Sequence, residues 1–383
     1  MKRPSCIMHL AMYSSNYPGN FIASLANLCG YLQNAGVACI LGLPERTKIR
    51  EWHSSLCSQG CRVIPLPNPG ASKLSCVRRI RECILQYRPT VVHTHFTYYD
   101  IPAAVAALLV RRSLRPRVVW HRHSDVGEKI VGVKRLRCLI KHRIIGRHVE
   151  HLAVSESIRS LLVAEGAPRS KICVIENGID FSRIHVTVEA RRNIRAEWHI
   201  PENDCVFLMF GWQPVVKGVD VAVNAFSQIR KQYNRCWLVI AGEEKTKHLL
   251  SERFPGEVDG VVVTSTRPEV SELYSGADVF ISASRTEGFS YAAVEAAYCR
   301  PVIASDIAGT DHLHDIPGVR FFRPEDAQSL AARMAECLIS FGPGQKPTAP
   351  DPNVVLHRYS VDRWSSCCFE FYGNSDGPVH PRP

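Results

Sequence analysis

Short hydrophobic runs recur along this chain, and amphipathic stretches separate them. The runs have the length and the β-branched content of buried strands, and turn residues follow many of them. This alternation of strand and helix favours parallel sheets covered by helices on both faces. The expected strands are 6–12, 37–43, 90–96, 117–121, 150–155 and 171–177, then 205–211, 236–242, 260–265, 278–284, 301–305 and 318–322.

The strands fall into two sets, which predicts two doubly wound α/β domains. Asn177-Gly178 is a turn dipeptide, and the stretch after it has no strand pattern. We therefore place a hinge near 178–190, with an N-terminal domain at 1–185 and a C-terminal domain at 186–345.

The C-terminal part of the chain has a different pattern. Residues 342–353 are rich in Pro and Gly and predict a linker. An amphipathic stretch at 354–372 predicts one last helix, and we expect a disordered tail at 373–383.

Length and composition agree with two globular domains. The 383 residues suit two domains of roughly 150–200 residues each, and 45% of them are hydrophobic. No apolar run reaches about 18 residues, so we expect no transmembrane helix. The apolar stretch 7–12 is too short for a signal peptide and is more typical of a first strand. The 15 cysteines are odd in number and form no CxxC pair, which favours reduced core residues over disulfides or a metal cluster.

The charge is unevenly distributed. The net charge is +11, and residues 1–185 hold 27 Lys or Arg against 11 Asp or Glu. The remaining residues hold 20 against 25. We expect the basic half to meet an anionic partner, with nucleic acid, a membrane surface and a phosphate-bearing ligand all open on charge alone.

The segment 278–299 carries the clearest candidate chemistry. A buried strand, the loop RTEG and a helix opening at Phe289 or Ser290 follow one another. A helix N-terminus after a Gly-containing turn can bind an anion. Ser290 could cap the helix or bond a phosphate oxygen, and Glu295 could accept hydrogen bonds from a cis-diol. The residues alone favour a plainer alternative, in which Glu287 stabilises the helix N-terminus and Glu295 is solvated.

The whole run SGADVFISASRTEGFSYAAVEAAYCRPVIASDIAG resembles the nucleotide-binding signature of retaining glycosyltransferases of family 4, with its E-x(7)-E motif. The resemblance implies that Glu295 binds the ribose of a nucleotide sugar and that Glu287 faces the sugar and the reacting centre. It also implies that Gly288, Phe289 and Ser290, at the start of the helix, approach the diphosphate.

A second stretch, FGWQPVVKGVDVAVNAF, resembles the family's G-R-L-x-x-x-K-G loop, which implies that Lys217 binds the donor phosphates. Trp212 stands where the family has arginine. Either another residue such as Arg285 supplies the charge, or donor binding is altered. The glycine that the family has just before Pro301 is also missing.

The N-terminal half matches this family more loosely. Gly19 would let the backbone approach a substrate phosphate or the acceptor. Histidines end two expected strands in VVHTHF and VVWHRHSD. His123 aligns best with the family's cleft histidine, and His121 is the alternative. The resemblance covers most of residues 5–340 and is specific in 205–305.

A basic amphipathic stretch spans 130–148. Val133, Leu136, Ile140 and Ile144 recur near helical spacing among lysines and arginines. The stretch could lie on an anionic membrane. We favour the alternative in which the apolar stripe packs inward and the basic face points outward.

The resemblance implies a GT-B fold, with two Rossmann-like domains facing a cleft, the acceptor on the first and the nucleotide sugar on the second. It also implies that the helix expected at 354–372 packs back on the N-terminal domain. The implied reaction is sugar transfer from a nucleotide diphosphate sugar to a hydroxyl of a carbohydrate or lipid-linked acceptor, with retention, in polysaccharide or glycolipid synthesis. We expect no cofactor and no essential metal, because no DxD motif is present. We expect no nucleic acid partner, and a cytoplasmic enzyme that associates peripherally with a membrane. A GT-B epimerase or phosphorylase, and a degenerate binding protein, stay open as alternatives.

Overall fold

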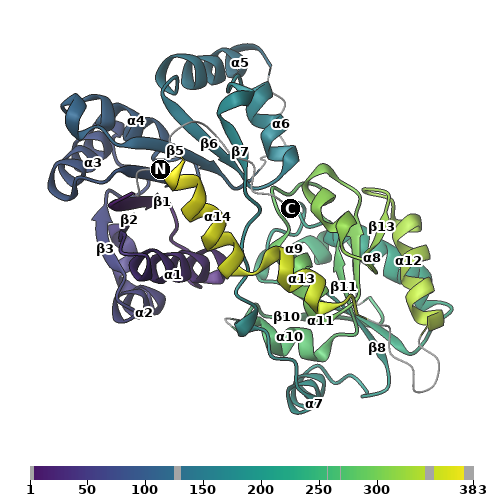
Figure 1. Cartoon of the computed structure of the whole chain (residues 1–383). Coiled ribbons are helices and arrows are strands. Elements are labelled where there is room, and N and C mark those ends of the chain that lie inside the picture. Colours follow the sequence, from purple (N-terminus) through teal and green to yellow (C-terminus); the bar gives the residue numbers. More distant parts are fainter. Residues whose placement is uncertain (1–3, 125–130, 257, 268, 341–348, 375–383) are drawn as a thin grey trace. The chain divides into compact units, whose positions relative to one another are not determined.

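The computed structural model describes residues 4–124, 131–256, 258–267, 269–340 and 349–374 (Figure 1). The chain divides into two compact units. The first consists of Met1–Gly178 with Val361–Pro383, and the second is Ile179–Ser360. Each unit has its own parallel sheet and hydrophobic core, so the prediction of two Rossmann-like α/β domains is confirmed.

The sheet of the first unit is parallel throughout its described strands. These are β1 (Cys6–Ala11), β2 (Ala38–Pro44), β3 (Arg62–Leu66), β4 (Val91–His95), β5 (Arg117–Arg122), β6 (Val149–Ala153) and β7 (Ile172–Val174). They lie in the order β3-β2-β1-β4-β5-β6-β7. The pairing places His9 beside His93, and His95 beside His121.

Helices cover both faces of this sheet. They are α1 (Gly19–Asn34), α2 (Glu51–Ser58), α3 (Lys73–Tyr87), α4 (Asp100–Leu108), α5 (Gly132–Leu139), α6 (Glu156–Ala164) and α14 (Val361–Gly373). On one face α1 and α14, side by side in Figure 1, pack on a cluster that includes Ile7 and Val91. On the other face α3 and α4 pack on a cluster that includes Met8 and Val92. Successive strand residues thus point to opposite faces and are buried on both.

The second unit repeats this architecture with a six-stranded parallel sheet, in the order β10-β9-β8-β11-β12-β13. The strands are β8 (Cys205–Phe210), β9 (Cys236–Ala241), β10 (Val261–Thr264), β11 (Val279–Ser282), β12 (Val302–Ser305) and β13 (Arg320–Phe322). The helices are α7 (Val188–Glu197), α8 (Val219–Arg230), α9 (Glu244–Arg253), α10 (Val270–Gly276), α11 (Tyr291–Cys299), α12 (Ala327–Ser340) and α13 (Pro352–Tyr359). Residues of α8 and α12 share one core with β8, β9 and β11.

Every expected strand overlaps an observed one, but β3 was not predicted. Its sequence RVIPL contains Pro65, which has no N–H for a strand ladder and argues against a central strand. The structure accommodates Pro65 because β3 is an edge strand that pairs on one side with β2.

The single helix expected at 354–372 is two helices. Its first part lies in α13 of the second unit, and its second part is α14 of the first unit. Between them Ser360 has an extended backbone, with φ −62° and ψ 146°, and pairs with Ile179. Gly178 accepts the close approach of α14, since a Cβ atom there would lie 2.5 Å from the Cβ of Trp364. Residues 342–348 of the expected linker (342–353) and residues 375–383 of the expected tail (373–383) lie outside the described residues.

All 15 cysteines are free thiols, and most of them are buried. Among the described residues, none of the helices combines the length and apolar character needed to cross a membrane.

Candidate functional site

The loops after β8 and β11 meet at the carboxyl end of the second sheet. Gly218 makes this approach possible, because a Cβ atom at this position would lie 2.0 Å from the carbonyl oxygen of Ala283. Its φ of +65° is also in the left-handed region that glycine adopts without strain. The backbone N–H of Arg285 donates to the carbonyl of Val216 at 2.8 Å, which joins the two loops a second time.

This contact brings Lys217 and Glu287 together. Lys217 Nζ lies 2.5 Å from Glu287 Oε1, and the hydroxyl of Ser284 donates to the same oxygen at 2.7 Å. Both charged side chains are largely buried. The plainer alternative for Glu287, a carboxylate that only stabilises a helix N-terminus, does not account for this pairing.

Neither Trp212 nor Arg285 adds an unbalanced positive charge to this site. The ring of Trp212 lies 5.2 Å from Lys217 Nζ, in cation–π geometry. Arg285 instead makes a bidentate ion pair with Asp220, with both N···O distances 3.0 Å, and a second pair with Glu325. The hydrogen bond to Asp220 raises the pKa of Arg285. Its charge is therefore already balanced by carboxylates.

Gly288, Phe289 and Ser290, which we expected to approach the diphosphate, are buried just before α11. The helix begins at Tyr291, and Ser290 is the N-cap residue, although its side chain makes no cap bond. The hydroxyl of Ser290 lies 3.5 Å from that of Ser282. Phe289 stacks on His312, with ring centroids 4.3 Å apart, and Gly288 is buried beside it. Of the two roles open to Ser290, a side-chain cap or a bond to a phosphate oxygen, the cap is wrong.

A glycine also packs closely against the backbone of Glu287. Gly309 follows β12, and a Cβ atom there would lie 2.1 Å from the carbonyl oxygen of Glu287. Any larger residue would displace the backbone that carries this carboxylate.

Glu295 is buried, so the alternative of a solvated Glu295 is wrong. Tyr274, on α10, donates its hydroxyl to Glu295 Oε2 at 2.9 Å. Burial raises the pKa of Tyr274 well above its usual value, and the neighbouring carboxylate adds to that effect. The phenol therefore stays protonated and holds Glu295 in place.

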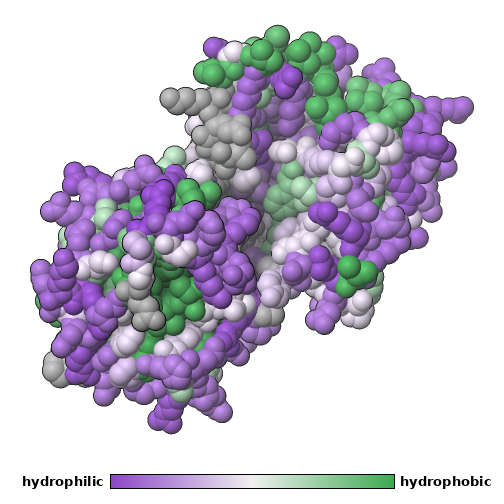
Figure 2. All heavy atoms as spheres, turned by 180° about the vertical axis from the view of Figure 1, so that it is seen from behind, coloured by the Kyte–Doolittle hydropathy of each residue, from purple (hydrophilic) through white to green (hydrophobic). Residues whose placement is uncertain are grey.

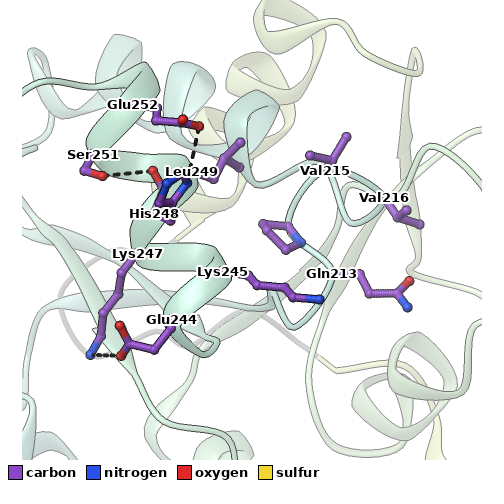
Figure 3. A pocket seen from close by; sticks show the side chains of 11 residues that line it. Gln213, Val215, Val216, Glu244, Lys245, Lys247, His248, Leu249, Ser251 and Glu252 are labelled. Atoms are coloured by element: carbon purple, nitrogen blue, oxygen red, sulfur yellow. Dashed lines mark hydrogen bonds and ion pairs between the residues drawn. The ribbon is translucent and has the colours of Figure 1, made fainter.

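A pocket of about 860 Å³ adjoins the loop that carries Lys217 (Figure 3). Gln213, Val215 and Val216 line one side of it, and α9 lines the other. On α9, Lys247 pairs with Glu244 at 3.0 Å.

The two candidates in the first unit lie at the carboxyl ends of its strands. Gly19 begins α1 with φ +54°, a conformation that favours glycine. His123 follows β5, and its Nε2 lies 2.9 Å from Nδ1 of His95. Burial lowers the pKa of His123 to about 3, so its ring is neutral at physiological pH.

The backbone beside this histidine is unusual. Phe96 and Thr97, directly after β4, both have positive φ, at 64° and 57°. Such conformations cost free energy in non-glycine residues and are concentrated at functional sites. The ring of Phe96 lies 4.8 Å from that of His123.

Sequence reasoning missed Tyr274 and Ser284. Neither belongs to a motif, and each reaches its partner only because α10, β11 and α11 pack together. It did find histidines at the ends of two strands, but not that His9 joins them.

The apolar stripe of the basic stretch is exposed, which contradicts the favoured expectation that it packs inward. Val133, Leu136 and Ile144 are 68%, 58% and 65% exposed, and the stripe continues from α5 into the following π-helical turn (Ile140–Ile145). In Figure 2 hydrophobic residues gather at the top of the view, where α5 and the turn after it lie. No residue of α5 is buried. Residues 125–130, just before it, lie outside the described residues.

Two family models match the chain, one in each unit. The model described as Glycosyltransferase Family 4 matches residues 23–183, and the model described as Glycosyl transferases group 1 matches residues 204–340. Together they reach from α1 to α12.

Curated relatives are distant and only partly covered. An uncharacterized glycosyltransferase of Methanocaldococcus jannaschii is 26% identical over 241 residues, which cover 56% of this chain and 59% of the relative. The alpha-monoglucosyldiacylglycerol synthase of Streptococcus pneumoniae is 24% identical over 309 residues, which cover 76% of this chain and 68% of the relative.

Solved structures are similar over almost the whole chain. The crystal structure of Anabaena HepE in complex with UDP and glucose superposes with a TM-score of 0.76 at 17% identity, and the match covers 96% of this chain and 99% of HepE. At this identity the likeness concerns the fold. From the two parallel sheets, the family models that match both units and this likeness, we conclude that the chain belongs to glycosyltransferase family 4 and has the GT-B fold.

Proposed function

We propose that this protein is a retaining glycosyltransferase, which transfers a sugar from a nucleotide diphosphate sugar to a hydroxyl group of an acceptor. The observation that carries the proposal is the pairing of Lys217 with Glu287 beside the start of α11. A cation, a carboxylate and the positive end of a helix dipole are there assembled by two neighbouring strands.

The second unit would hold the donor. Lys217 and the helix start near Ser290 would balance the charge of the diphosphate. Glu295, held by Tyr274, would accept hydrogen bonds from the ribose hydroxyls. Glu287 would face the sugar. Arg285 is not part of this proposal, because Asp220 and Glu325 already balance its charge.

The reaction breaks the bond between C1 of the donor sugar and the phosphate oxygen, and it forms a bond from C1 to the acceptor oxygen on the same face. The acceptor proton passes to the departing phosphate oxygen. Fixed positive charge stabilises the diphosphate as its negative charge grows. His123, neutral because it is buried, would hydrogen-bond a sugar hydroxyl or the leaving phosphate.

The donor can be identified by a thermal-shift screen of UDP-, GDP-, ADP- and dTDP-sugars, followed by a transfer assay with the labelled sugar. UDP-glucose comes first, because HepE has been crystallised with UDP and glucose. We expect a nucleotide sugar to raise the melting temperature and the product to keep the anomeric configuration of the donor, as read by NMR. Inverted product would overturn retention, and the absence of any stabilising nucleotide sugar would overturn the donor site.

We further propose that α5 and the turn after it bind an anionic membrane surface, which would place the enzyme peripherally at a membrane and favour a lipid-linked acceptor. Support comes from the exposed stripe of Val133, Leu136 and Ile144 and from the exposed arginines at 135, 137 and 143. The similarity to a relative named alpha-monoglucosyldiacylglycerol synthase also supports a lipid acceptor. Lys141 is not part of this surface, because it pairs with Asp100 at 2.8 Å.

Sedimentation with vesicles of phosphatidylglycerol and of phosphatidylcholine tests this surface. We expect binding to the anionic vesicles that weakens with salt, since charges are screened over about 8–10 Å at physiological ionic strength. Leu136→Ser with Ile144→Ser should abolish binding, and so should Arg135→Ser with Arg137→Ser. The matched control is Leu74→Ser, which removes a leucine of α3 that is even more exposed than Leu136. Unchanged binding by both double variants would exclude this surface.

The family models, both of which describe glycosyltransferases, do not favour the alternatives of an epimerase, a phosphorylase or a binding protein. Trp212 in place of the expected arginine is the observation that keeps a non-catalytic binding protein in view. Transfer assays separate the possibilities, because an epimerase changes the donor without an acceptor, a phosphorylase needs phosphate, and a binding protein forms no product.

A further inference from the structure

Five histidines gather on one face of the first sheet. They are His9 on β1, His93 and His95 on β4, His121 on β5 and His123 just after it. β1, β4 and β5 are neighbouring strands, and these residues run from the middle of the strands to just past the end of β5. Each of the five lies two or four residues after a strand residue of the core under α1 and α14. Because side chains alternate along a strand, all five point to that same face.

The rings are close together. The centroids of His93 and His95 are 4.3 Å apart, and those of His9 and His93 are 5.0 Å apart. All of these side chains except His123 are fully buried. Burial favours the neutral imidazole, whose unprotonated nitrogen carries a lone pair.

The ring nitrogens of His9 and His95 face each other. His9 Nδ1 lies 3.0 Å from His95 Nε2, and His93 Nδ1 lies 2.7 Å from the hydroxyl of Tyr372 on α14. Within the described part of the chain, Nε2 of His93 and Nε2 of His9 are buried without a hydrogen-bond partner, and so are both nitrogens of His121. Native proteins rarely leave buried polar atoms unpaired, so these nitrogens call for a ligand.

We propose that His9, His93 and His95 bind one divalent transition-metal ion, with Zn²⁺ as the best fit to imidazole ligands. One ring nitrogen of each lies within 4.8 Å of those of the other two. Two nitrogens at about 2.0–2.1 Å from a tetrahedral zinc ion lie roughly 3.3–3.4 Å apart, so small side-chain shifts complete the site. The three ligands leave a fourth position.

The other nitrogens of two ligands already have orienting partners, as metal-binding histidines commonly do. Tyr372 bonds Nδ1 of His93, and His123 bonds Nδ1 of His95, which leaves Nε2 of both rings for the ion. With Nε2 of His95 on the metal, its Nδ1–H must donate to Nε2 of His123, so neutral His123 carries its own hydrogen on Nδ1. The site would thus select the tautomer of the candidate cleft histidine. It belongs to the first unit, whereas Lys217 belongs to the second, and it does not depend on the proposed function.

The test uses the full-length protein, stripped of metal with a chelator under mild denaturation and refolded with Zn²⁺ or Co²⁺. We expect about one ion per chain by elemental analysis, a visible absorption band typical of Co²⁺ bound by imidazole, and a higher melting temperature with Zn²⁺. Protein refolded with Zn²⁺ that retains no stoichiometric metal would overturn the proposal.

Variants locate the site. His93→Gln should remove stoichiometric metal, and His248→Gln, an exposed histidine on α9, should keep it. Tyr372→Phe, which retains the ring and removes only the hydroxyl, should weaken Co²⁺ binding about 10- to 100-fold; it also tests the site if His93→Gln does not fold. His121→Gln is the sharpest control, because His95, His121 and His123 form a second possible triad. Loss of metal in His121→Gln with retention in His9→Gln would overturn our assignment in favour of that triad.

Discussion

Lys217 and Glu287 form a 2.5 Å ion pair between the loops that follow β8 and β11. Seventy residues separate them in the chain, and they meet because Gly218 lets its loop touch the backbone of Ala283. In the proposed function, the diphosphate of a donor would compete with Glu287 for this ammonium group. The pair would then hold Lys217 ready and set its affinity for the diphosphate.

Lys217→Ala should slow sugar transfer by about tenfold to a few hundredfold. A charge-assisted hydrogen bond to a buried partner is worth roughly 1.5–3 kcal/mol, and with Trp212 in place of arginine few cations remain to replace it. Lys217→Arg should retain part of the activity, since it keeps the charge in a different geometry. The rates are measured with the best donor from the screen. If Lys217→Ala transfers within twofold of the wild type, Lys217 does not bind the donor.

Glu287→Gln should separate donor binding from catalysis. The change keeps the shape of the side chain and removes the charge that holds Lys217, so we expect UDP to bind up to about tenfold more tightly, which corresponds to about 1.4 kcal/mol. Transfer should nevertheless fall, because the sugar loses its carboxylate. Calorimetry with UDP and a transfer assay measure the two effects. Weaker UDP binding would mean that Glu287 does not compete for Lys217. Glu244→Gln, exposed on α9, is the control.

Tyr274→Phe should raise the Michaelis constant for the donor more than it lowers kcat. The change removes the 2.9 Å hydrogen bond to Glu295, which costs roughly 1.5–3 kcal/mol for a charged acceptor, and a ribose contact is largely uniform binding. Glu295→Ala should act in the same direction. Steady-state kinetics over a range of donor concentrations checks this, and an unchanged Michaelis constant in both variants would remove Glu295 from the donor site.

Gly218→Ala should impair the site without touching any charged group. The added methyl would lie 2.0 Å from the carbonyl oxygen of Ala283, and alanine is strained at φ +65°. The loop must withdraw, and Lys217 moves with it. We expect a loss of transfer comparable to that in Lys217→Ala, whereas Gly256→Ala, where nothing lies within 4 Å, should keep activity despite its own positive φ.

His312 should make the second unit sensitive to acid. Burial lowers its pKa to about 3 from the ordinary value of 6.5, so between these values the unfolded chain binds a proton that the folded chain does not. Stability is therefore lost as the pH falls from about 6.5 towards 3, by about 1.4 kcal/mol per pH unit for this residue. His312→Phe and His312→Leu should flatten the pH dependence of urea unfolding by that amount. A slope equal to that of the wild type would show that His312 is protonated in the folded state.

Local patterns were enough to predict the architecture. Runs such as 205–211 and 236–242 are hydrophobic and β-rich within a few residues, and their alternation with amphipathic helices predicts parallel sheets wherever the strands later pair. The same holds for the strand, turn and helix around Glu287. Pro65 shows the limit, because whether a proline can stand in a strand depends on whether that strand becomes an edge.

The partners of each side chain were decided by the tertiary structure. Lys217 meets Glu287 because β8 lies next to β11, and Arg285, a candidate for the same role, is instead paired with Asp220. The stripe of Leu136 and Ile144 is exposed although its spacing suited inward packing, since only the folded chain determines which core a helix packs on. Sequence by itself determined most of the strands and helices, since their patterns depend on neighbours along the chain. Strand order and register bring together residues far apart in sequence, and only the folded chain contains those contacts.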